Sequence, residues 1–490
     1  MKIENLLNNL WNVFRYNPDG PLLFNSGFFL FFFFICLLFS QLFYNNRRAK
    51  IFFLLFASIY FYYKSSGIYF VLVIISSIID FIAGREIFKS QSKSAKKVFL
   101  LLSLVTNFGL LGYFKYTNFF IKTINDVASA GLDFADIFLP VGISFFTFQS
   151  LSYTIDIYRG RLEPENNFLN FLFFVSFFPQ LVAGPIVRAS VFLPQINEKP
   201  VLSRKDIGRA IFLIVTGLFK KAIIADYISI NFVDRVFELP GRYTGLENLF
   251  ALYGYSLQIF CDFSGYSDMA IGLALLLGFK LPDNFNSPYQ SASITEFWRR
   301  WHISLSTWLK DYLYISLGGN RKGKIRQYGN LMITMLLGGL WHGASWKFVV
   351  WGGIHGAVLA IEKKFNIPEW SNKNLLTRII GVIVTFHIVA LCWIFFRAQD
   401  FGLAMEMINQ ILFNFHGEIF LQFIDGYSLV FILILAGFIY HFIPRSFDNY
   451  LEGLITKSPL VLKALLLVFI IWLVAQAKSA DIQPFIYFQF

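Results

Sequence analysis

The sequence predicts an all-α, polytopic membrane protein, and three observations lead to this fold class. Of the 490 residues, 56% are hydrophobic and 62 are phenylalanine, and the mean hydropathy is +0.57. Only 15% are charged, well below the roughly 25% that is usual for a soluble domain. Long apolar runs alternate with short basic segments, as in proteins whose helices cross a bilayer repeatedly. One soluble core could not bury this much apolar surface.

The chain is expected to begin with an interfacial amphipathic helix at residues 1–20. Apolar residues recur there at helical spacing on one face, namely Ile3, Leu6, Leu7, Leu10, Trp11 and Phe14, before the breaker Asn17-Pro18-Asp19-Gly20-Pro21. No small-residue cleavage site follows the first apolar run, so we expect no removable signal peptide. A transmembrane core is then predicted at 21–458, and a final span with an aromatic tail at 459–490.

The candidate membrane spans are the apolar stretches 27–44, 50–63, 67–83, 97–114, 139–153, 168–184, 207–226, 248–279, 329–361, 378–396, 427–443 and 459–477. The stretches 248–279 and 329–361 are each expected to be a broken or re-entrant pair. Several stretches are shorter than the ~20 residues that a spanning helix needs. Interrupted helices at membrane depth are tolerated where they are buried in protein or line a cavity. The middle of the chain is therefore expected to surround a cavity.

The net charge of +12 does not indicate nucleic-acid binding, because the basic residues fall in short loops near 47–50, 85–97, 321–326 and 363–378. The positive-inside rule places these loops in the cytoplasm and both chain ends outside. Cys36, Cys261 and Cys392 lie within apolar segments without metal-ligand or CxxC spacing. We therefore expect no disulfide and no metal site, and no nucleic-acid partner.

Two histidines 40 residues apart are the first candidates for chemistry. His302 follows Phe297-Trp298-Arg299-Arg300-Trp301, and His342 lies in Gly339-Leu340-Trp341-His342-Gly343. An ionisable ring among apolar residues near lipid is costly unless it has a function or a partner.

For His342, the surrounding Gly338, Gly339 and Gly343 predict open backbone that lets a substrate approach. A neutral imidazole there suits a general base. The alternative is a histidine bonded to a neighbouring carbonyl. His302 is less decisive, since it could orient a donor, polarise a carbonyl or cap a helix. The remaining histidines, His355, His387, His416 and His441, are interpreted as structural or loop residues.

A helix is predicted to begin at Ser293-Ile294-Thr295-Glu296, where Ser293 and Glu296 fit a capping box. Its apolar stripe is Phe297, Trp301, Leu305, Trp308 and Tyr312. Arg299 and Lys310 are 11 residues apart and would be nearly eclipsed on a continuous helix. This basic row suits an anionic ligand from the cytoplasmic side, and the alternative is an anchor for lipid headgroups.

Several stretches in order along the chain resemble the membrane-bound O-acyltransferases, and most closely the bacterial alginate and peptidoglycan O-acetylation proteins. They are Pro140–Gln149, Phe177–Ile186, Phe297–Leu305 with Asp311–Tyr314 and Gly318–Arg321, and Leu340–Gly343. The likeness covers nearly the whole chain from about residue 24, and the ordered series of motifs is specific.

The resemblance implies a ring of about 11–12 transmembrane helices, with further short helices, around a central funnel in a bacterial inner membrane. In this family the residue matching His342 is catalytic, and the residue matching His302 lies toward the cytoplasmic mouth. We expect acetyl-coenzyme A as the donor, with Arg299, Arg300 and Lys310 near its phosphates. The acceptor system would include a periplasmic SGNH-type, AlgX-like O-acetyltransferase that modifies a polysaccharide.

The tail Phe485-Ile486-Tyr487-Phe488-Gln489-Phe490 by itself fits an aromatic belt at the membrane interface. It also resembles the C-terminal aromatic hexapeptide of related acylation systems, which implies that Tyr487 is a covalent acyl relay. The alternatives for the whole chain are D-alanyl transfer to teichoic acid and a transporter or flippase. Sequence alone does not identify the polysaccharide, which could be alginate, peptidoglycan or another exopolysaccharide.

Overall fold

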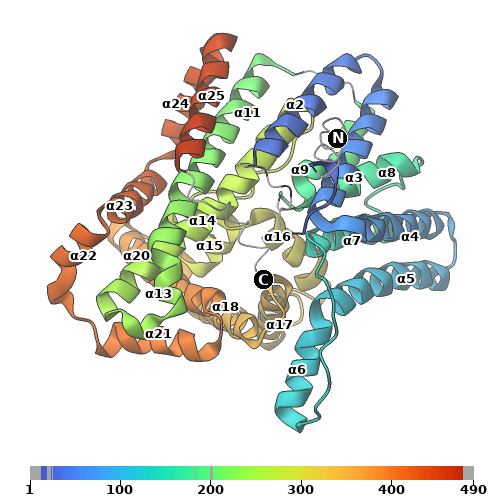
Figure 1. Cartoon of the computed structure of the whole chain (residues 1–490). Coiled ribbons are helices and arrows are strands. Elements are labelled where there is room, and N and C mark those ends of the chain that lie inside the picture. Colours follow the sequence, from blue (N-terminus) through green and yellow to red (C-terminus); the bar gives the residue numbers. More distant parts are fainter. Residues whose placement is uncertain are drawn as a thin grey trace, which may run out of the picture. The chain divides into compact units, whose positions relative to one another are not determined.

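The computed structural model describes residues 13–18, 22, 24, 26–182, 184–198 and 202–477. Over these residues the secondary structure is helical and contains no β-strand, which confirms the all-α prediction (Figure 1). The chain divides into two compact units: Met1–Ala210 with Ala270–Pro282, and Ile211–Met269 with Asp283–Phe490. Most of the expected N-terminal helix at 1–20, and the whole tail with Tyr487, lie outside the described residues.

The helices of the first unit belong mainly to the N-terminal part of the chain. They are α2 (Gly27–Leu42), α3 (Arg47–Ser66), η1 (Gly67–Tyr69), α4 (Phe70–Lys89), α5 (Lys93–Leu111), η2 (Gly112–Tyr116), α6 (Thr117–Ala128), α7 (Ile143–Tyr158), α8 (Phe168–Ser176), α9 (Phe178–Leu181) and α10 (Ala189–Asn197), with the start of α11 (Arg204–Leu218) and the end of α14 (Gly245–Leu276). Phenylalanine rings fill its core. The Phe178 ring, for example, lies 5.3 Å from that of Phe32 and 5.5 Å from that of Phe61.

A buried carboxylate joins three helices of this unit. Asp80 of α4 is fully buried and accepts hydrogen bonds from Ser103 Oγ at 2.6 Å and from Asn107 Nδ2 at 2.8 Å, both on α5. Ser150 of α7 donates to the same carboxylate. Burying a carboxylate is costly unless neighbouring donors satisfy it. This polar cluster therefore sets the relative register of α4, α5 and α7.

The second unit holds the remaining helices. Besides the rest of α11 and α14, they are η3 (Phe219–Ala225), α12 (Asp226–Ile228), η4 (Ser229–Val233), α13 (Asp234–Glu238), η5 (Pro240–Arg242), η6 (Pro288–Gln290), α15 (Ile294–Arg300), α16 (Ile303–Trp308), η7 (Leu309–Tyr314), α17 (Lys324–His342), α18 (Trp346–Phe365), α19 (Ile367–Ser371), α20 (Leu375–Arg397), α21 (Phe401–Phe413), η8 (Gly417–Ile419), α22 (Phe420–Gly426), α23 (Ser428–Phe442), α24 (Arg445–Lys457) and α25 (Leu460–Ala477).

The predicted break within 248–279 is wrong, because α14 is one continuous helix of 32 residues. The polar residues that suggested a break have charged partners on the preceding segment. Asp262 pairs with Lys221 at 2.5 Å, and Asp268 pairs with Lys220 at 2.8 Å. A buried charge is tolerated when it is paired in this way. The carboxylates thus stay inside the helix without interrupting it.

Among the described residues, four helical stretches are long and apolar enough to cross a membrane: Arg47–Lys89, Lys93–Ala128, Gly245–Leu276 and Leu375–Arg397. A fifth arises if Gly417–Gly426 and Ser428–Phe442, which meet at a bend of 99°, form one span. This number is lower than the about 11–12 spans expected, because other predicted stretches form shorter or less apolar helices, such as Gly27–Leu42. The chain is nevertheless a multi-pass, all-α membrane protein.

Candidate active site

His342 is the last residue of α17, at the tip of a hairpin that α17 forms with α18. Its side chain is 3% exposed. The imidazole meets the rings of Trp341 and Trp351 edge-on, with centroids 5.1 Å apart in both cases, and that of Phe396 at 5.4 Å. Three helices, α17, α18 and α20, therefore supply aromatic walls around this ring. The break between α17 and α18 confirms the prediction for 329–361.

The glycines beside His342 do not form the open backbone predicted from the sequence. A Cβ at Gly339 would collide with the carbonyl oxygen of Phe348, and one at Gly343 would collide with the Phe348 ring. A Cβ at Gly338 would lie 3.2 Å from Leu309 Cδ1. Gly339 and Gly343 are small because α17 and α18 approach each other closely, whereas Gly338 faces Leu309 of η7. Their role is to pack the hairpin that positions His342.

His302 occupies a left-handed turn, with φ 42° and ψ 56°, between α15 and α16. The continuous helix predicted from Ser293 through Tyr312 is therefore wrong, and so is the eclipsed row of Arg299 and Lys310. A left-handed residue other than glycine costs about 1–2 kcal/mol, so tertiary contacts must stabilise the turn. The predicted N-cap is confirmed, because Ser293 Oγ accepts from the Glu296 backbone at 3.1 Å. The reciprocal half of the capping box is wrong, because the Glu296 carboxylate accepts from Ala292 N at 3.0 Å.

Asn284 supplies the contacts that stabilise this turn. Its backbone oxygen accepts from Ile303 N at 2.9 Å, and its Oδ1 accepts from Ser304 N at 3.2 Å. The same Oδ1 lies 3.2 Å from Nδ1 of His302. Because a backbone N–H can only donate, the shared atom is an acceptor, and Nδ1 of His302 must carry the proton. Nε2 is then the acceptor nitrogen of this ring.

Burial also sets the charge of His302. The residue is fully buried, and desolvation lowers its pKa to about 3. The ring is therefore neutral at physiological pH. A neutral ring with its proton on Nδ1 cannot protonate another group through Nε2. It can only accept a hydrogen bond there.

The structure brings the two histidines together around one indole ring. The centroid of Trp341 lies 5.9 Å from that of His302 and 5.1 Å from that of His342. The two imidazoles therefore cannot be further apart than the sum of these distances. Phe263 of α14 contacts the other edge of His302, at 4.6 Å. His302 and His342, 40 residues apart in sequence, thus lie in one aromatic-lined site.

The three basic residues predicted near the donor differ in their surroundings. Arg299 and Lys310 are exposed. Arg300 is instead paired with Glu296 at 2.7 Å, and it donates to the backbone oxygen of Asn286 at 3.2 Å. Exposed cations can reach an anionic ligand with little reorganisation, whereas Arg300 would first have to leave these partners.

His355, interpreted above as a structural or loop residue, has surroundings similar to those of His342. In the structure it is fully buried on α18, with its ring 4.7 Å from Trp351 and 5.2 Å from Trp298. Neither ring nitrogen has a hydrogen-bond partner among the described residues. Trp351 contacts both His342 and His355. The i, i+4 spacing of Trp351 and His355 was the available signal, because it puts both on one helix face.

The substitution Asn284→Ala removes the acceptor that fixes the tautomer and the orientation of the His302 ring. It is expected to lower turnover about tenfold or more, with little change in KM. Loss of a shared buried acceptor should also destabilise the fold by about 1–3 kcal/mol. Steady-state kinetics per folded molecule separates the two effects. Asn248→Ala is the matched control, because the side chain of this buried asparagine bonds only backbone carbonyls within the described part of the chain. Equal losses of turnover in both variants would contradict the positioning role.

Comparison with known proteins identifies the family of the chain. Residues 159–366 match the model of MBOAT, the membrane-bound O-acyltransferase family. The chain is 38% identical over 433 residues to a probable alginate O-acetylase of Pseudomonas putida, covering 82% of this chain and 86% of that protein.

Two further relatives differ in their named substrates. A peptidoglycan O-acetyltransferase of Helicobacter pylori is 37% identical over 360 residues, covering 68% of each chain. A teichoic acid D-alanyltransferase of Bacillus subtilis is 30% identical over 278 residues, covering 53% of this chain and 69% of that protein. These matches show that the chain is an acyltransferase that belongs to the membrane-bound O-acyltransferase family.

Proposed function

We propose that this chain transfers an acetyl group from cytoplasmic acetyl-coenzyme A across the bacterial inner membrane, toward a cell-envelope or secreted polysaccharide. The observation that carries the proposal is the buried pair His302 and His342, both in ring contact with Trp341. Aromatic walls lower the local dielectric constant, which strengthens electrostatic interactions at the site. O-acetyltransferases among the relatives support acetyl as the transferred group.

In the proposed reaction, His342 acts as the general base. Its neutral imidazole takes the proton of an acceptor hydroxyl while the hydroxyl oxygen attacks the thioester carbonyl carbon. The carbon–sulfur bond then breaks, and the thiolate of coenzyme A leaves with the proton held by His342. The products are an acetyl ester and free coenzyme A, so His342 returns to its neutral form.

His302 is assigned a positioning role in this scheme. Its proton is held on Nδ1 by Asn284, so its Nε2 presents a lone pair and cannot donate. A lone pair held at a fixed position can orient a polar hydrogen of the donor or of the acceptor. Arg299 and Lys310 are proposed to bind the phosphates of coenzyme A, with Arg300 bracing α15 through Glu296.

The acceptor hydroxyl is proposed to be that of Tyr487, which would carry the acetyl group to a periplasmic SGNH-type transferase. A phenol is a weak nucleophile at its ordinary pKa of about 10, so a base such as His342 must take its proton. Of the alternatives, D-alanyl transfer is supported by a relative that matches less of this chain. Membership of an acyltransferase family disfavours the transporter alternative.

The purified full-length chain in detergent is expected to release thiol from acetyl-coenzyme A faster than detergent alone does, because water can replace a slow acceptor. A thiol-reactive dye measures this release. A D-alanyl carrier-protein thioester, offered under the same conditions, should not react. Turnover of the D-alanyl thioester together with inert acetyl-coenzyme A would replace the acetyl proposal with the D-alanyl alternative.

A further inference from the structure

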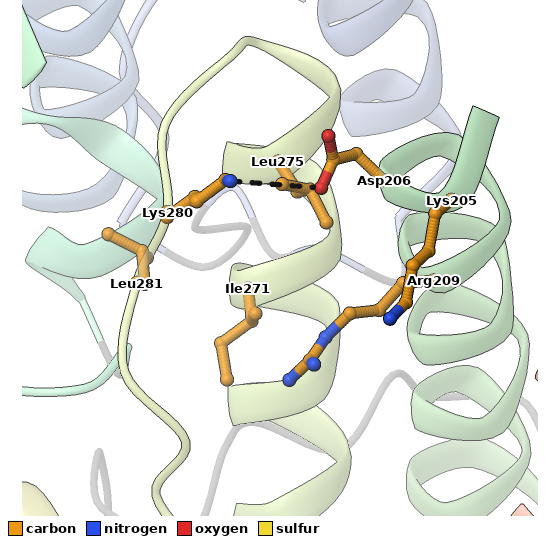
Figure 2. Close-up of a pocket in the computed structure, with 7 residues that line it drawn as sticks. All are labelled: Lys205, Asp206, Arg209, Ile271, Leu275, Lys280 and Leu281. Atoms are coloured by element: carbon orange, nitrogen blue, oxygen red, sulfur yellow. Dashed lines mark ion pairs between the residues drawn. The ribbon is translucent and has the colours of Figure 1, made fainter. Parts of the chain in front are cut away.

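A cavity of about 420 Å³ lies in the first unit, and none of the residues that line it belongs to the site proposed above. Its polar wall is formed by Lys205, Asp206 and Arg209 of α11 and by Lys280, which follows α14. Figure 2 shows these side chains approaching from both sides of α14, with the ion pair of Lys280 and Asp206 at 3.9 Å. Three cations against one carboxylate leave the cavity with an excess of positive charge.

The rest of the cavity is lined by apolar side chains. Ile271 and Leu275 of α14, and Leu281 beyond it, are each less than 9% exposed and form an apolar wall (Figure 2). Ile271 and Leu275 belong to the last turns of a helix that is apolar and long enough to span a membrane. The cations lie at the end of this helix and in the first turns of α11. A basic rim above an apolar wall at the end of a span is the geometry of a lipid headgroup site.

The basic rim consists of Lys205, Arg209 and Lys280, and the side chain of Gln195 fixes the backbone of Lys280. Gln195 at the end of α10 accepts from Lys280 N at 2.7 Å and donates to Lys280 O at 3.0 Å. Two residues further on, Asn197 O accepts a hydrogen bond from Arg47 at 2.8 Å. Arg47 is the first residue of α3, in a basic segment that the charge distribution places in the cytoplasm. The pocket therefore lies among cations. It is at that end of the first unit which we expect to face the cytoplasm.

We propose that this pocket binds the phosphate headgroup of an anionic glycerophospholipid of the cytoplasmic leaflet. Lys205, Arg209 and Lys280 would contact the phosphate, and Ile271, Leu275 and Leu281 the first part of an acyl chain. A soluble phosphate ester such as coenzyme A offers the same anionic chemistry, but it has no long acyl chain that would pack against the apolar wall. The inference does not depend on acetyl transfer, because it concerns binding to a different set of residues.

The test measures lipid binding to the full-length chain in detergent by native mass spectrometry. Phosphatidylglycerol is expected to bind the wild-type chain more tightly than phosphatidylcholine does. The double variant Lys205→Gln/Arg209→Gln should weaken phosphatidylglycerol binding roughly 30-fold, as expected for two cations near an anionic headgroup. This variant keeps Lys280, its partner Asp206 and the contacts of Gln195. An excess of coenzyme A should not displace the lipid.

Lys93→Gln/Lys97→Gln is the matched control, since both lysines are exposed on α5 of the same unit and line no part of the pocket. It removes the same charge and should leave binding unchanged. Equal weakening in both double variants would overturn the site, because general charge would then explain the binding. Displacement by coenzyme A would overturn the lipid assignment. No catalytic turnover is measured, so either failure leaves the proposed acetyl transfer unaffected.

Discussion

Replacing His342 with alanine is expected to lower acetyl transfer by about 10²–10⁴-fold, the range that general-base catalysis contributes. Without the imidazole, no group held between Trp341, Trp351 and Phe396 can accept the proton of the acceptor hydroxyl. The substitution also leaves a cavity at the tip of the α17–α18 hairpin, so protein stability must be measured alongside activity. Acetyl transfer per folded molecule, from labelled acetyl-coenzyme A, is the quantity to compare.

His387→Ala is the matched control for this experiment. His387 is an exposed histidine on α20, bonded to Tyr253 and to the backbone oxygen of Ile383. Its removal should leave acetyl transfer within about twofold of wild type, because surface substitutions away from a site have small effects. A second variant, His342→Gln, fills most of the cavity but supplies no base near neutral pH. Full activity in this variant would remove His342 from the proposed role.

The second large effect is expected from Tyr487→Phe, which should abolish acetylation of the envelope polymer while the membrane protein accumulates normally. Phenylalanine keeps the aromatic ring and removes only the hydroxyl that would carry the acetyl group. An aromatic belt at the interface would tolerate this exchange, whereas a covalent relay would not. Acetyl analysis of envelope polysaccharides from cells that carry only the variant measures the effect.

Tyr450→Phe provides the comparison for the tail variant, since Tyr450 is 61% exposed on α24. It should leave polymer acetylation unchanged. Retained acetylation in Tyr487→Phe cells would refute the relay and leave the belt as the function of the tail. Thiol release from acetyl-coenzyme A should survive in the Tyr487 variant, because water can still accept the acetyl group.

Composition and local pattern were sufficient to predict much of the fold. The apolar runs predicted an all-α membrane protein, the Ser293 to Glu296 spacing predicted the start of α15, and the stretch 329–361 predicted a broken helix pair. These features depend on residues close in sequence, so pattern reasoning reaches them. The candidate histidines were also identified in this way, because an ionisable residue in an apolar stretch stands out in the sequence alone.

Tertiary contacts decided the features that sequence reasoning missed. The turn at His302 exists because Asn284, 18 residues earlier, accepts hydrogen bonds from the backbone after it. The helix α14 continues through Asp262 because Lys221, on a different segment, neutralises that carboxylate. Gly339 is explained by Phe348 on the opposite helix rather than by an approaching substrate. None of these partners can be read from local periodicity.

The most direct test of the central claim is mass spectrometry of the C-terminal peptide after the intact chain has been incubated with acetyl-coenzyme A. The claim is that the imidazole of His342 enables an acetyl group to move from a thioester to a tyrosine hydroxyl. One added acetyl group on Tyr487 is expected in the wild-type chain, and none in His342→Ala. Equal labelling of Tyr487 in both chains, or its absence from the wild type during turnover, would contradict the claim.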